Sequence, residues 1–524
     1  MAIFEKTFFI LLLLSSIFSI VSSRKGPSSS NIDWWCNQTP HPKPCKHYTT
    51  QMNNHFKIKH KSEFRGMLVQ LALKQALIMQ KESQNSQQNS SVHQTVHDDC
   101  LKLFRNTIFH LNRTFEGLNN ASKNCSPDDA QTWLTTSLTN IETCKNGAFE
   151  LNAKDFNFIV QTNVIEMIRN SLAINMYFMK HNRETKEGFY PNWFSRHERK
   201  LLNANSIVKA NLVVAKDGSG NFKTVQAALD ASAKRKYKTR FVIHIKKGVY
   251  RENIEVAVHN DNIMLVGDGM QNTIITSSRS VQGGYTTYSS ATAGIDGLHF
   301  IARDITFQNT AGPQKGQAVA LRSASDLSVF YRCAISGYQD TLMAHAQRQF
   351  YRQCYIYGTV DFIFGNAAVV FQNCNIFVRK PLDGQANMIT AQGRGDPFQN
   401  TGISFHNCKI RAASDLKPVI DKYNTFLGRP WQQYSRVVVM KTFMDTLVSP
   451  LGWSPWGDTD FAQDTLYYGE YENYGPGSST AHRVKWPGYH VITSPNEASK
   501  FTVTGLLAGP TWLATTTVPF TSGL

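Results

Sequence analysis

A short sequence theme recurs through the second half of the chain at a nearly constant spacing. Each copy is a run of apolar and β-branched residues bounded by Gly, Asn or Asp, a composition typical of short strands. Four copies carry a cysteine, at Cys333, Cys354, Cys374 and Cys408, with separations of 21, 20 and 34 residues. No copy is followed by an amphipathic helix, so the repeat predicts a parallel β-helix, in which each coil contacts only its neighbours.

The longest separation indicates a loop inserted over residues 379–400, which is rich in Gly, Pro and Asp. Functional residues often collect on such insertions. A β-sandwich whose strands have this spacing by coincidence is the alternative that the repeat alone leaves open.

Two aspartates stand one repeat apart within this series. Asp340 lies in the sequence Gly-Tyr-Gln-Asp-Thr-Leu, and Asp361 lies 21 residues later in Gly-Thr-Val-Asp-Phe-Ile-Phe-Gly. Neighbouring strands are about 4.8 Å apart, so stacked coils are expected to hold the two carboxyl groups at roughly that separation. Gln317 and Gln339, which are 22 residues apart, are expected to stack in the same way. Because two carboxylates this close cannot both ionise cheaply, the pair suits acid–base chemistry.

The first part of the chain follows another pattern and predicts separate modules. Residues 1–23 read as a secretory signal, because their apolar run is too short to span a bilayer and ends in small residues. Residues 31–180 show apolar spacing near 3.6, which predicts an all-α four-helix bundle. Residues 181–202 form a linker whose basic pair Arg199–Lys200 is a candidate processing site, and an ordinary solvated linker is the alternative. The repeats occupy the last module, residues 203–524.

The cysteines and glycosylation sequons fit a secreted protein. The candidate disulfides are Cys36–Cys45, Cys100–Cys144 and Cys354–Cys374, which leave Cys125 as the odd cysteine of the first module. The cysteines of the repeat are alternatively a buried ladder of free thiols that pack as small apolar groups. The sequons begin at Asn37, Asn89, Asn112, Asn120 and Asn124, all within the helical module. No spacing of Cys and His is typical of a metal site, so no metal is expected.

The formal net charge of the chain is +17. A strongly basic surface favours anionic partners through long-range attraction. The secretory signal and the sequons argue against nucleic acid, so an acidic extracellular polysaccharide is the expected partner. A basic charge that serves only solubility is the alternative.

The second module resembles the plant pectinesterases (pectin methylesterases) from residue 214 to the C-terminus. The first module resembles the pectinesterase-inhibitor-type pro-region, and the segment from Arg199 to Leu202 resembles the processing motif that this family places between the two. The family fold is a right-handed parallel β-helix, which agrees with the repeat. Five blocks carry the resemblance: Gly248-Val249-Tyr250-Arg251-Glu252, Gln317-Ala318-Val319-Ala320-Leu321-Arg322, Gly337-Tyr338-Gln339-Asp340-Thr341-Leu342, Asp361-Phe362-Ile363-Phe364-Gly365 and Leu427-Gly428-Arg429-Pro430-Trp431.

The resemblance implies a carboxylic ester hydrolase that removes methyl esters from the galacturonate units of pectin and releases methanol. It assigns Asp361 as nucleophile, Asp340 as general acid and then base, and Gln339 as oxyanion donor. Thr287, Gln317, Arg429 and Trp431 match substrate-binding positions, and Tyr338, Phe362 and Phe364 are expected to line the cleft. No cofactor is implied. The chain lacks a Gly-X-Ser-X-Gly nucleophile motif, so a serine esterase is not expected.

Two other functions stay open on the sequence. Carboxyl groups about 5–5.5 Å apart also suit a retaining glycosidase, here one acting on pectin. A non-catalytic wall-binding or inhibitor protein is the second alternative. The expected protein is secreted to the extracellular cell wall as a monomer, with no nucleic-acid partner and no membrane contact after signal removal. Its expected partners are methyl-esterified homogalacturonan, its own pro-domain as intramolecular inhibitor, and separate inhibitor proteins.

Overall fold

The computed structural model describes residues 32–50, 58, 60–84, 91–119, 125–153, 163–182, 209–236, 239–516 and 518–524. The predicted signal peptide, the Arg199–Lys200 pair and the sequons at Asn89, Asn120 and Asn124 lie outside these residues. Within the described residues, no helix combines the length and the apolar character that crossing a membrane requires.

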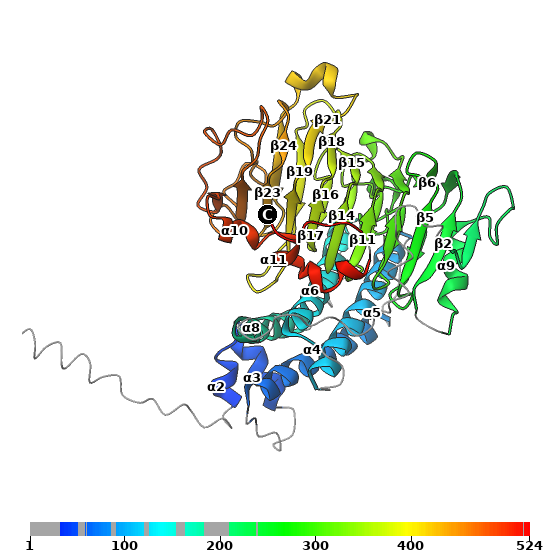
Figure 1. The fold of residues 1–524 in the computed structure, drawn as a ribbon. Helices are drawn as coiled ribbons and strands as arrows, with labels where there is room; N and C mark the ends of the chain where they lie inside the picture. The colour runs from blue at the N-terminus through cyan, green and yellow to red at the C-terminus, as the bar shows by residue number, and fades with distance from the viewer. Residues whose placement is uncertain are drawn as a thin grey trace, which may run out of the picture.

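A helical domain forms the first part of the described chain and lies below the strands in Figure 1. Its four long helices share one apolar core, as the 3.6-residue spacing predicts. Helix α6 begins with a capping box in which Ser126 and Asp129 bond each other's backbone N–H groups, with Pro127 at the first helical position. The helices are α2 (Ile32–Cys36), α3 (Pro42–Thr50), α4 (Lys61–Gln84), α5 (Ser91–Asn119), α6 (Pro127–Glu150) and α8 (Val164–Asn182).

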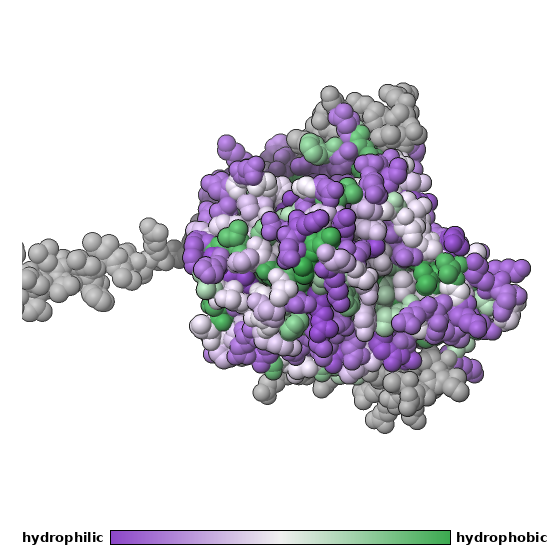
Figure 2. Space-filling model, turned by 90° about the horizontal axis from the view of Figure 1, so that it is seen from above, coloured by the Kyte–Doolittle hydropathy of each residue, from purple (hydrophilic) through white to green (hydrophobic). Residues whose placement is uncertain are grey.

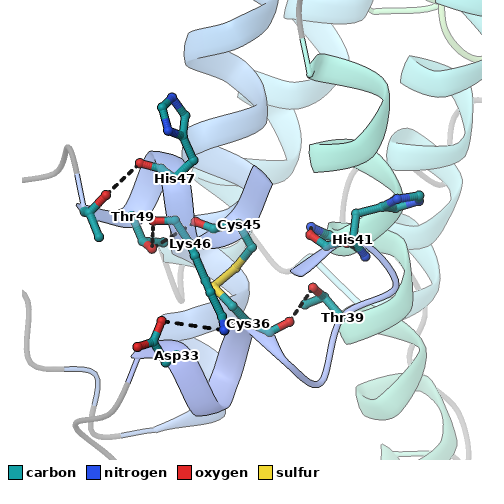
Figure 3. The surroundings of a disulfide bond; sticks show 10 residues. Asp33, Cys36, Thr39, His41, Cys45, Lys46, His47 and Thr49 are labelled. Carbon is teal, nitrogen blue, oxygen red and sulfur yellow. Dashed lines mark hydrogen bonds and ion pairs between the residues drawn. A yellow bond between two sulfur atoms is a disulfide. The ribbon is translucent and has the colours of Figure 1, made fainter. Parts of the chain in front are cut away.

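Two disulfides fasten this domain, and both confirm the prediction. The bond between Cys36 and Cys45 joins α2 to α3 (Figure 3). The bond between Cys100 and Cys144 joins α5 to α6. Cys125 is a free thiol, as its odd position in the sequence indicated. The sequon asparagines Asn37 and Asn112 are both exposed.

The second domain is a parallel β-helix, which confirms the fold predicted from the repeat. Each coil from β2 to β22 contributes one strand to each of three sheets, and every strand pair is parallel. Sheet A contains β1 (Leu212–Val214), β2 (Phe241–Ile245), β5 (Ile263–Gly267), β8 (Ile301–Arg303), β11 (Ser328–Tyr331), β14 (Arg348–Arg352), β17 (Ala368–Gln372), β20 (Gly402–His406), β23 (Arg436–Met440), β25 (Tyr467–Tyr471) and β26 (Tyr489–Val491). Sheet B contains β3 (Gly248–Arg251), β6 (Thr273–Ser277), β9 (Thr306–Asn309), β12 (Ala334–Ser336), β15 (Tyr355–Gly358), β18 (Asn375–Val378), β21 (Lys409–Ala412) and β24 (Phe443–Met444). Sheet C contains β4 (Ile254–Val256), β7 (Ala293–Ile295), β10 (Leu321–Ser323), β13 (Leu342–Ala344), β16 (Ile363–Gly365), β19 (Asn387–Gln392) and β22 (Thr425–Pro430).

Short helices close the β-helix. Helix α9 (Val225–Ala233) packs against the first strands, and α10 (Pro495–Ser499) and α11 (Val503–Leu507) belong to the C-terminal segment that crosses sheet A in Figure 1. Val503, Leu507, Trp512 and Leu513 from this segment cover the outer apolar side chains of sheet A. The 3-10 turns are η3 (Val281–Gly283), η4 (Pro313–Lys315), η5 (Lys417–Lys422), η6 (Gly509–Thr511) and η7 (Leu513–Thr515).

Identical positions of successive repeats stack inside the β-helix. Phe330, Tyr351, Phe371 and Phe405 are register partners in sheet A and are almost completely buried. Their ring centroids follow each other at 4.6, 4.7 and 5.2 Å in stacked geometry. Such offset stacking adds to the free energy of burial, so this column is a main source of core stability.

The repeat cysteines form the buried ladder, and the predicted disulfide between Cys354 and Cys374 is wrong. Both thiols are free, as are those of Cys333 and Cys408. The Cys354 thiol donates to the Phe330 carbonyl at 3.2 Å, and Cys374 donates to the Tyr351 carbonyl at 3.5 Å. Register partners on parallel coils point the same way and not toward each other, which does not suit the geometry of a disulfide.

Removing one ring from the aromatic column is expected to destabilise the β-helix strongly. Phe371→Ala should lower the free energy of unfolding by about 3–5 kcal/mol, because the ring is fully buried between two others and leaves a cavity. Urea titration followed by tryptophan fluorescence measures the change. Phe461→Ala is the matched control, since Phe461 is 38% exposed and its loss should cost only about 0.5 kcal/mol. Equal effects of the two substitutions would contradict the role of the column.

Candidate active site

Asp340 and Asp361 lie on consecutive coils, in the turns that lead from sheet B to sheet C. Asp340 lies between β12 and β13, and Asp361 lies between β15 and β16. Two residues further on, Leu342 and Ile363 are register partners, and the Asp340 N–H donates to the Val360 carbonyl at 3.0 Å. The two aspartates are therefore side by side at the coil spacing, about 4.8 Å.

Both aspartates adopt left-handed backbone conformations, with φ of 60° for Asp340 and 50° for Asp361. This conformation is unusual for a residue with a side chain, although Asp tolerates it better than most. Because both turns share it, the two carboxyl groups leave their coils in the same direction. The stacked coils above and below hold this conformation in place.

The two aspartates line a cavity of about 230 Å³. All seven predicted catalytic and substrate-binding residues border it: Thr287, Gln317, Gln339, Asp340, Asp361, Arg429 and Trp431. Tyr288, Met343, Phe364, Ala391 and Trp456 complete the wall from the β-helix. Thr143, Asn146, Gly147 and Glu150 enter it from α6 of the helical domain.

Arg429 distinguishes the two aspartates. Its guanidinium donates two hydrogen bonds to Asp361, from Nε to Oδ1 at 2.9 Å and from Nη2 to Oδ2 at 2.6 Å. This fork geometry is the strongest form of a carboxylate hydrogen bond. The guanidinium also lies 4.5 Å from the ring centroid of Trp456, which holds it from the other side. Among the ion pairs of the described residues, none includes Asp340.

The environment raises the pKa of both aspartates, but to different extents. Burial raises the pKa of Asp340, and the charges of Asp361 and Glu150 raise it further, so that it lies well above its usual range. Burial also raises the pKa of Asp361, but the hydrogen bonds and the charge of Arg429 oppose this effect. The proton that the pair shares is therefore held by Asp340, and the negative charge is held by Asp361.

Two neutral amides lie beside the carboxyl pair. Gln339 directly precedes Asp340, and the carbonyl of Gln339 accepts a hydrogen bond at 3.3 Å from the N–H of Ala318, the residue after Gln317. The two glutamines therefore occupy adjacent coils and border the same cavity, as the 22-residue spacing predicted. Their side-chain N–H groups are donors that stay uncharged at any pH.

Aromatic rings form one wall of the cavity. Trp431 directly follows β22 and meets Phe364 edge to face, with ring centroids 5.9 Å apart. Gly393 makes room for Trp431, because a Cβ atom at this position would lie 2.8 Å from the indole ring. The expectation for Phe364 is met, since it borders the cavity. Phe362 is fully buried in the interior of the β-helix, so its predicted place in the cleft is wrong.

Tyr338 also differs from its predicted place. It is not among the residues that border the cavity. Its hydroxyl accepts a hydrogen bond from Arg379 Nη2 at 2.6 Å, and the Arg379 guanidinium lies 3.7 Å from its ring centroid. Both residues lie in the turns between sheets B and C, where the left-handed aspartates redirect the chain, so the alternation of a strand does not fix where their side chains point.

Helix α6 covers the cavity, a feature that no sequence motif indicated. The Thr287 N–H donates to the Glu150 carboxylate at 2.9 Å. One turn earlier, Gly147 packs against Thr286, whose Cγ2 would lie 3.1 Å from a Cβ atom added to the glycine. Thr143 is hydrogen-bonded to the His345 ring at 2.8 Å. The exposed rim of the cavity is thus shared between the two domains.

Partly buried ion pairs link the two domains around this helix. Lys102 of α5 pairs with Glu255 and, at 3.1 Å, with Asp296 of the β-helix. Asp129 of α6 pairs with Arg348 at 2.8 Å. Asp296 also pairs with Arg322 at 2.6 Å, and Arg348 also pairs with Asp326 at 2.8 Å, so the links between the domains extend charge networks of the β-helix. Within the described residues, no group of three or more His, Cys, Asp or Glu side chains is arranged to hold a metal ion.

Two protein families match the chain, one for each domain. The family described as Pectinesterase matches residues 211–510. The family described as Plant invertase/pectin methylesterase inhibitor matches residues 30–174. The helical domain with α6 is thus the inhibitor-type part, and the β-helix with the carboxyl pair is the pectinesterase part.

Relatives and solved structures agree with this division. The chain is 56% identical over 517 residues to probable pectinesterase/pectinesterase inhibitor 33 of Arabidopsis thaliana, covering 95% of this chain and 87% of the relative. It is 52% identical over 511 residues to pectinesterase 2 of Citrus sinensis, covering 97% and 98%. The structure of pectin methylesterase from carrot is similar with a TM-score of 0.59 and 57% identity, covering 61% of this chain and 99% of that one. The chain therefore belongs to the pectinesterase family and carries an inhibitor-type helical domain ahead of its β-helix.

Proposed function

We propose that this protein hydrolyses the methyl esters of galacturonate units in pectin, releasing methanol and leaving free carboxylates. One observation carries the proposal. Two buried carboxyl groups lie on adjacent coils, and a bidentate arginine makes one of them the anion and the other the acid. Ester hydrolysis through a carboxylate nucleophile needs one group of each kind.

In the first step, a carboxylate oxygen of Asp361 attacks the carbonyl carbon of the ester. The carbonyl oxygen becomes an oxyanion, which the side-chain N–H groups of Gln339 and Gln317 stabilise; one such donor is worth roughly 2.7–4 kcal/mol. The bond to the methoxy oxygen breaks, and Asp340 gives its proton to that oxygen. Methanol leaves, and the galacturonyl group stays joined to Asp361 as an anhydride.

In the second step, Asp340 is a carboxylate and takes a proton from a water molecule. The oxygen of this water attacks the galacturonyl carbon, and the bond to Asp361 breaks. Asp361 regains its negative charge, Asp340 regains its proton, and the new galacturonic acid releases a proton to solvent. Trp431 and Phe364 offer an apolar wall for the sugar ring and the methyl group. Membership of the pectinesterase family leaves the glycosidase and the non-catalytic alternatives without support.

The full chain is latent in this proposal, with the helical domain as its intramolecular inhibitor. The support is the position of α6, whose residues Thr143, Asn146, Gly147 and Glu150 border the catalytic cavity. A long polysaccharide needs an open cleft on both sides of the reacting unit. Processing between the domains, near Arg199–Lys200, would allow the helical domain to leave. We further propose that the processed enzyme is secreted and acts in the cell wall.

Removing either carboxyl group is expected to abolish methanol release while leaving the fold intact. Asp361→Asn and Asp340→Asn should each lower the rate on methylated pectin by about 10³-fold or more, because the nucleophile or the acid is lost. Asp230→Asn is the matched control and should keep the full rate, because Asp230 is an exposed residue of α9. Circular dichroism checks the fold of each variant. Substantial activity of purified Asp361→Asn would refute the assigned nucleophile.

The full chain is expected to be at least about tenfold less active than the fragment that begins at Asn203, because α6 blocks the cleft. Gly147→Leu in the full chain should recover much of the activity, because a side chain at position 147 would collide with Thr286 and weaken the docking of α6. Leucine has a high helix propensity, so α6 itself should stay folded. Phe149→Ala is the control on the same turn of α6, because Phe149 is 89% exposed. Equal rates for the full chain and the fragment would rule out latency.

Latency is expected to weaken as the pH rises from about 5 to 8. Glu142 of α6 faces Asp396, Arg169 (3.6 Å) and Lys145, and burial raises the pKa of Glu142 to about 7. The docked state therefore holds the Glu142 proton more tightly than the undocked state does. Protonated Glu142 favours docking below the usual pKa of a carboxyl group, and this contribution to docking is lost as the pH rises through 7. The ratio of fragment to full-chain activity, measured across this range, should therefore fall. Glu142→Gln should flatten the change, while exposed Glu82→Gln should not; a ratio that rises with pH contradicts the account.

A further inference from the structure

A second hollow lies at the opposite corner of each coil, where sheet A turns into sheet B. It has a volume of about 340 Å³. Its wall includes Arg332, Gln353, Asn373, Asn375, Asn407 and Lys409, which we call the corner groove. All of these residues belong to the β-helix, and the catalytic turns lie at the other end of sheet B. The corner groove is therefore separate from the catalytic cavity.

The floor of the corner groove repeats with the coils. Gln353, Asn373 and Asn407 occupy the same corner position on successive coils, each exposed and each in a left-handed conformation with φ between 52° and 55°. The Asn373 N–H donates to the His406 carbonyl at 3.1 Å, and the Asn407 N–H donates to the Met440 carbonyl at 3.2 Å, so the coils stay in register. Amide side chains thus recur about every 4.8 Å along the axis, a spacing that suits a ligand with a short repeat, such as a polysaccharide.

The charges beside the corner groove are mainly positive. Lys409 is exposed, and none of the ion pairs among the described residues includes it. The Arg352 guanidinium donates to the side-chain amide oxygens of Gln372 at 2.7 Å and Asn373 at 2.9 Å, both of which are uncharged. Arg332 does have an acidic partner, Asp304, at 2.6 Å. The positive charges of Lys409 and Arg352 are therefore not neutralised by an acidic side chain of the described residues, and they favour an anionic ligand.

Flat rings continue the surface onto sheet B. Tyr355 borders the corner groove, and its ring is nearly parallel to that of Phe377, which in turn stacks on Tyr357 at 4.9 Å. Partly exposed rings of this kind offer apolar faces to sugar rings, while the amides offer donors and acceptors to hydroxyl groups. A ligand with a sugar ring and a carboxylate in each unit matches all three kinds of group.

We propose that the corner groove binds a stretch of de-esterified galacturonan, at a distance from the catalytic cavity and without reacting with it. This inference rests on the proposed function, because it takes the polymer from that reaction. Each contact alone is weak, but a chain held at two places on one protein gains affinity through effective concentration. Such a site would keep the enzyme on the region of pectin that it has already de-esterified.

The helical domain leaves the corner groove open. Strands β15, β18 and β21 of sheet B lie on the side of the β-helix that faces away from the helical domain (Figure 1). Figure 2 views the molecule from this side and shows a mainly hydrophilic surface with small apolar spots. The full chain is therefore suited to the test, because α6 borders the catalytic cavity but no residue of α6 borders the corner groove.

The test measures binding of oligogalacturonate to the full chain by isothermal titration at low salt. The wild-type chain should bind the de-esterified oligomer more tightly than the fully methyl-esterified one, and added salt should weaken the binding. Lys409→Glu should lower the affinity roughly tenfold. Asn407→Asp should also lower it, because the new carboxylate repels the anionic oligomer; the fold should not change, since Asp has nearly the shape of Asn and tolerates the left-handed backbone. Lys223→Glu, an equal charge change on an exposed residue near the start of the β-helix, should leave the affinity unchanged.

Equal affinities of Lys409→Glu and Lys223→Glu would overturn the proposal, as would equal binding of the charged and the methylated oligomer. Methanol release by the fragment from residue 203 on a short methylated oligomer serves as the separate readout of catalysis, and Lys409→Glu should not change it. Absence of methanol from the wild-type fragment would refute the proposed function and leave the binding result standing. Normal methanol release with no oligomer binding would refute the corner groove alone.

Discussion

Hydrogen bonds between consecutive coils hold each strand residue beside its counterpart on the next coil, and this constraint sets the rest of the structure. Leu342 pairs with Ile363 because their strands are in register, and Asp340 and Asp361 are neighbours for the same reason. The same stacking aligns the aromatic column inside the β-helix and the exposed amides at its corner. A shift of one coil by a single residue would turn every one of these side chains to the other face.

Stacking alone would give two equivalent carboxyl groups, and Arg429 removes this symmetry. Its fork of hydrogen bonds stabilises the anion on Asp361, while burial and two nearby negative charges stabilise the acid on Asp340. The arginine comes from β22, two coils further along sheet C, so the chain must complete these coils before the site exists. The chemistry thus depends on a difference between two identical residue types, produced entirely by their surroundings.

The β-helix and the carboxyl pair could be predicted from the sequence because both follow from one spacing. The outcome for Cys354 and Cys374 shows the limit of that spacing, since it predicts that two thiols are neighbours but not that they point in parallel. Phe362 was placed wrongly because it lies in the turn before β16, next to the left-handed Asp361, and the motif does not record which way a side chain in this turn points. Glu150 and Gly147 could not be found at all, because the contact between α6 and the cavity joins two modules with unrelated patterns. Gly393 is similar, since its role is visible only once Trp431 lies against it.

The helical domain adds a second use of charge to the same site. Glu150 brings a carboxylate to Thr287 at the edge of the catalytic cavity and raises the pKa of Asp340 further. Lys102 and Asp129 attach the helices through ion pairs outside the cavity, so attachment and occlusion are separate tasks of different residues.

The most direct measurement is a carbon-13 NMR titration of the side-chain carboxyl groups of Asp340 and Asp361 in the full chain. The account predicts that Asp361 loses its proton first and that Asp340 stays protonated at pH values well above the usual range for an aspartate. Titration of both groups at the same pH, or of Asp340 before Asp361, would contradict it.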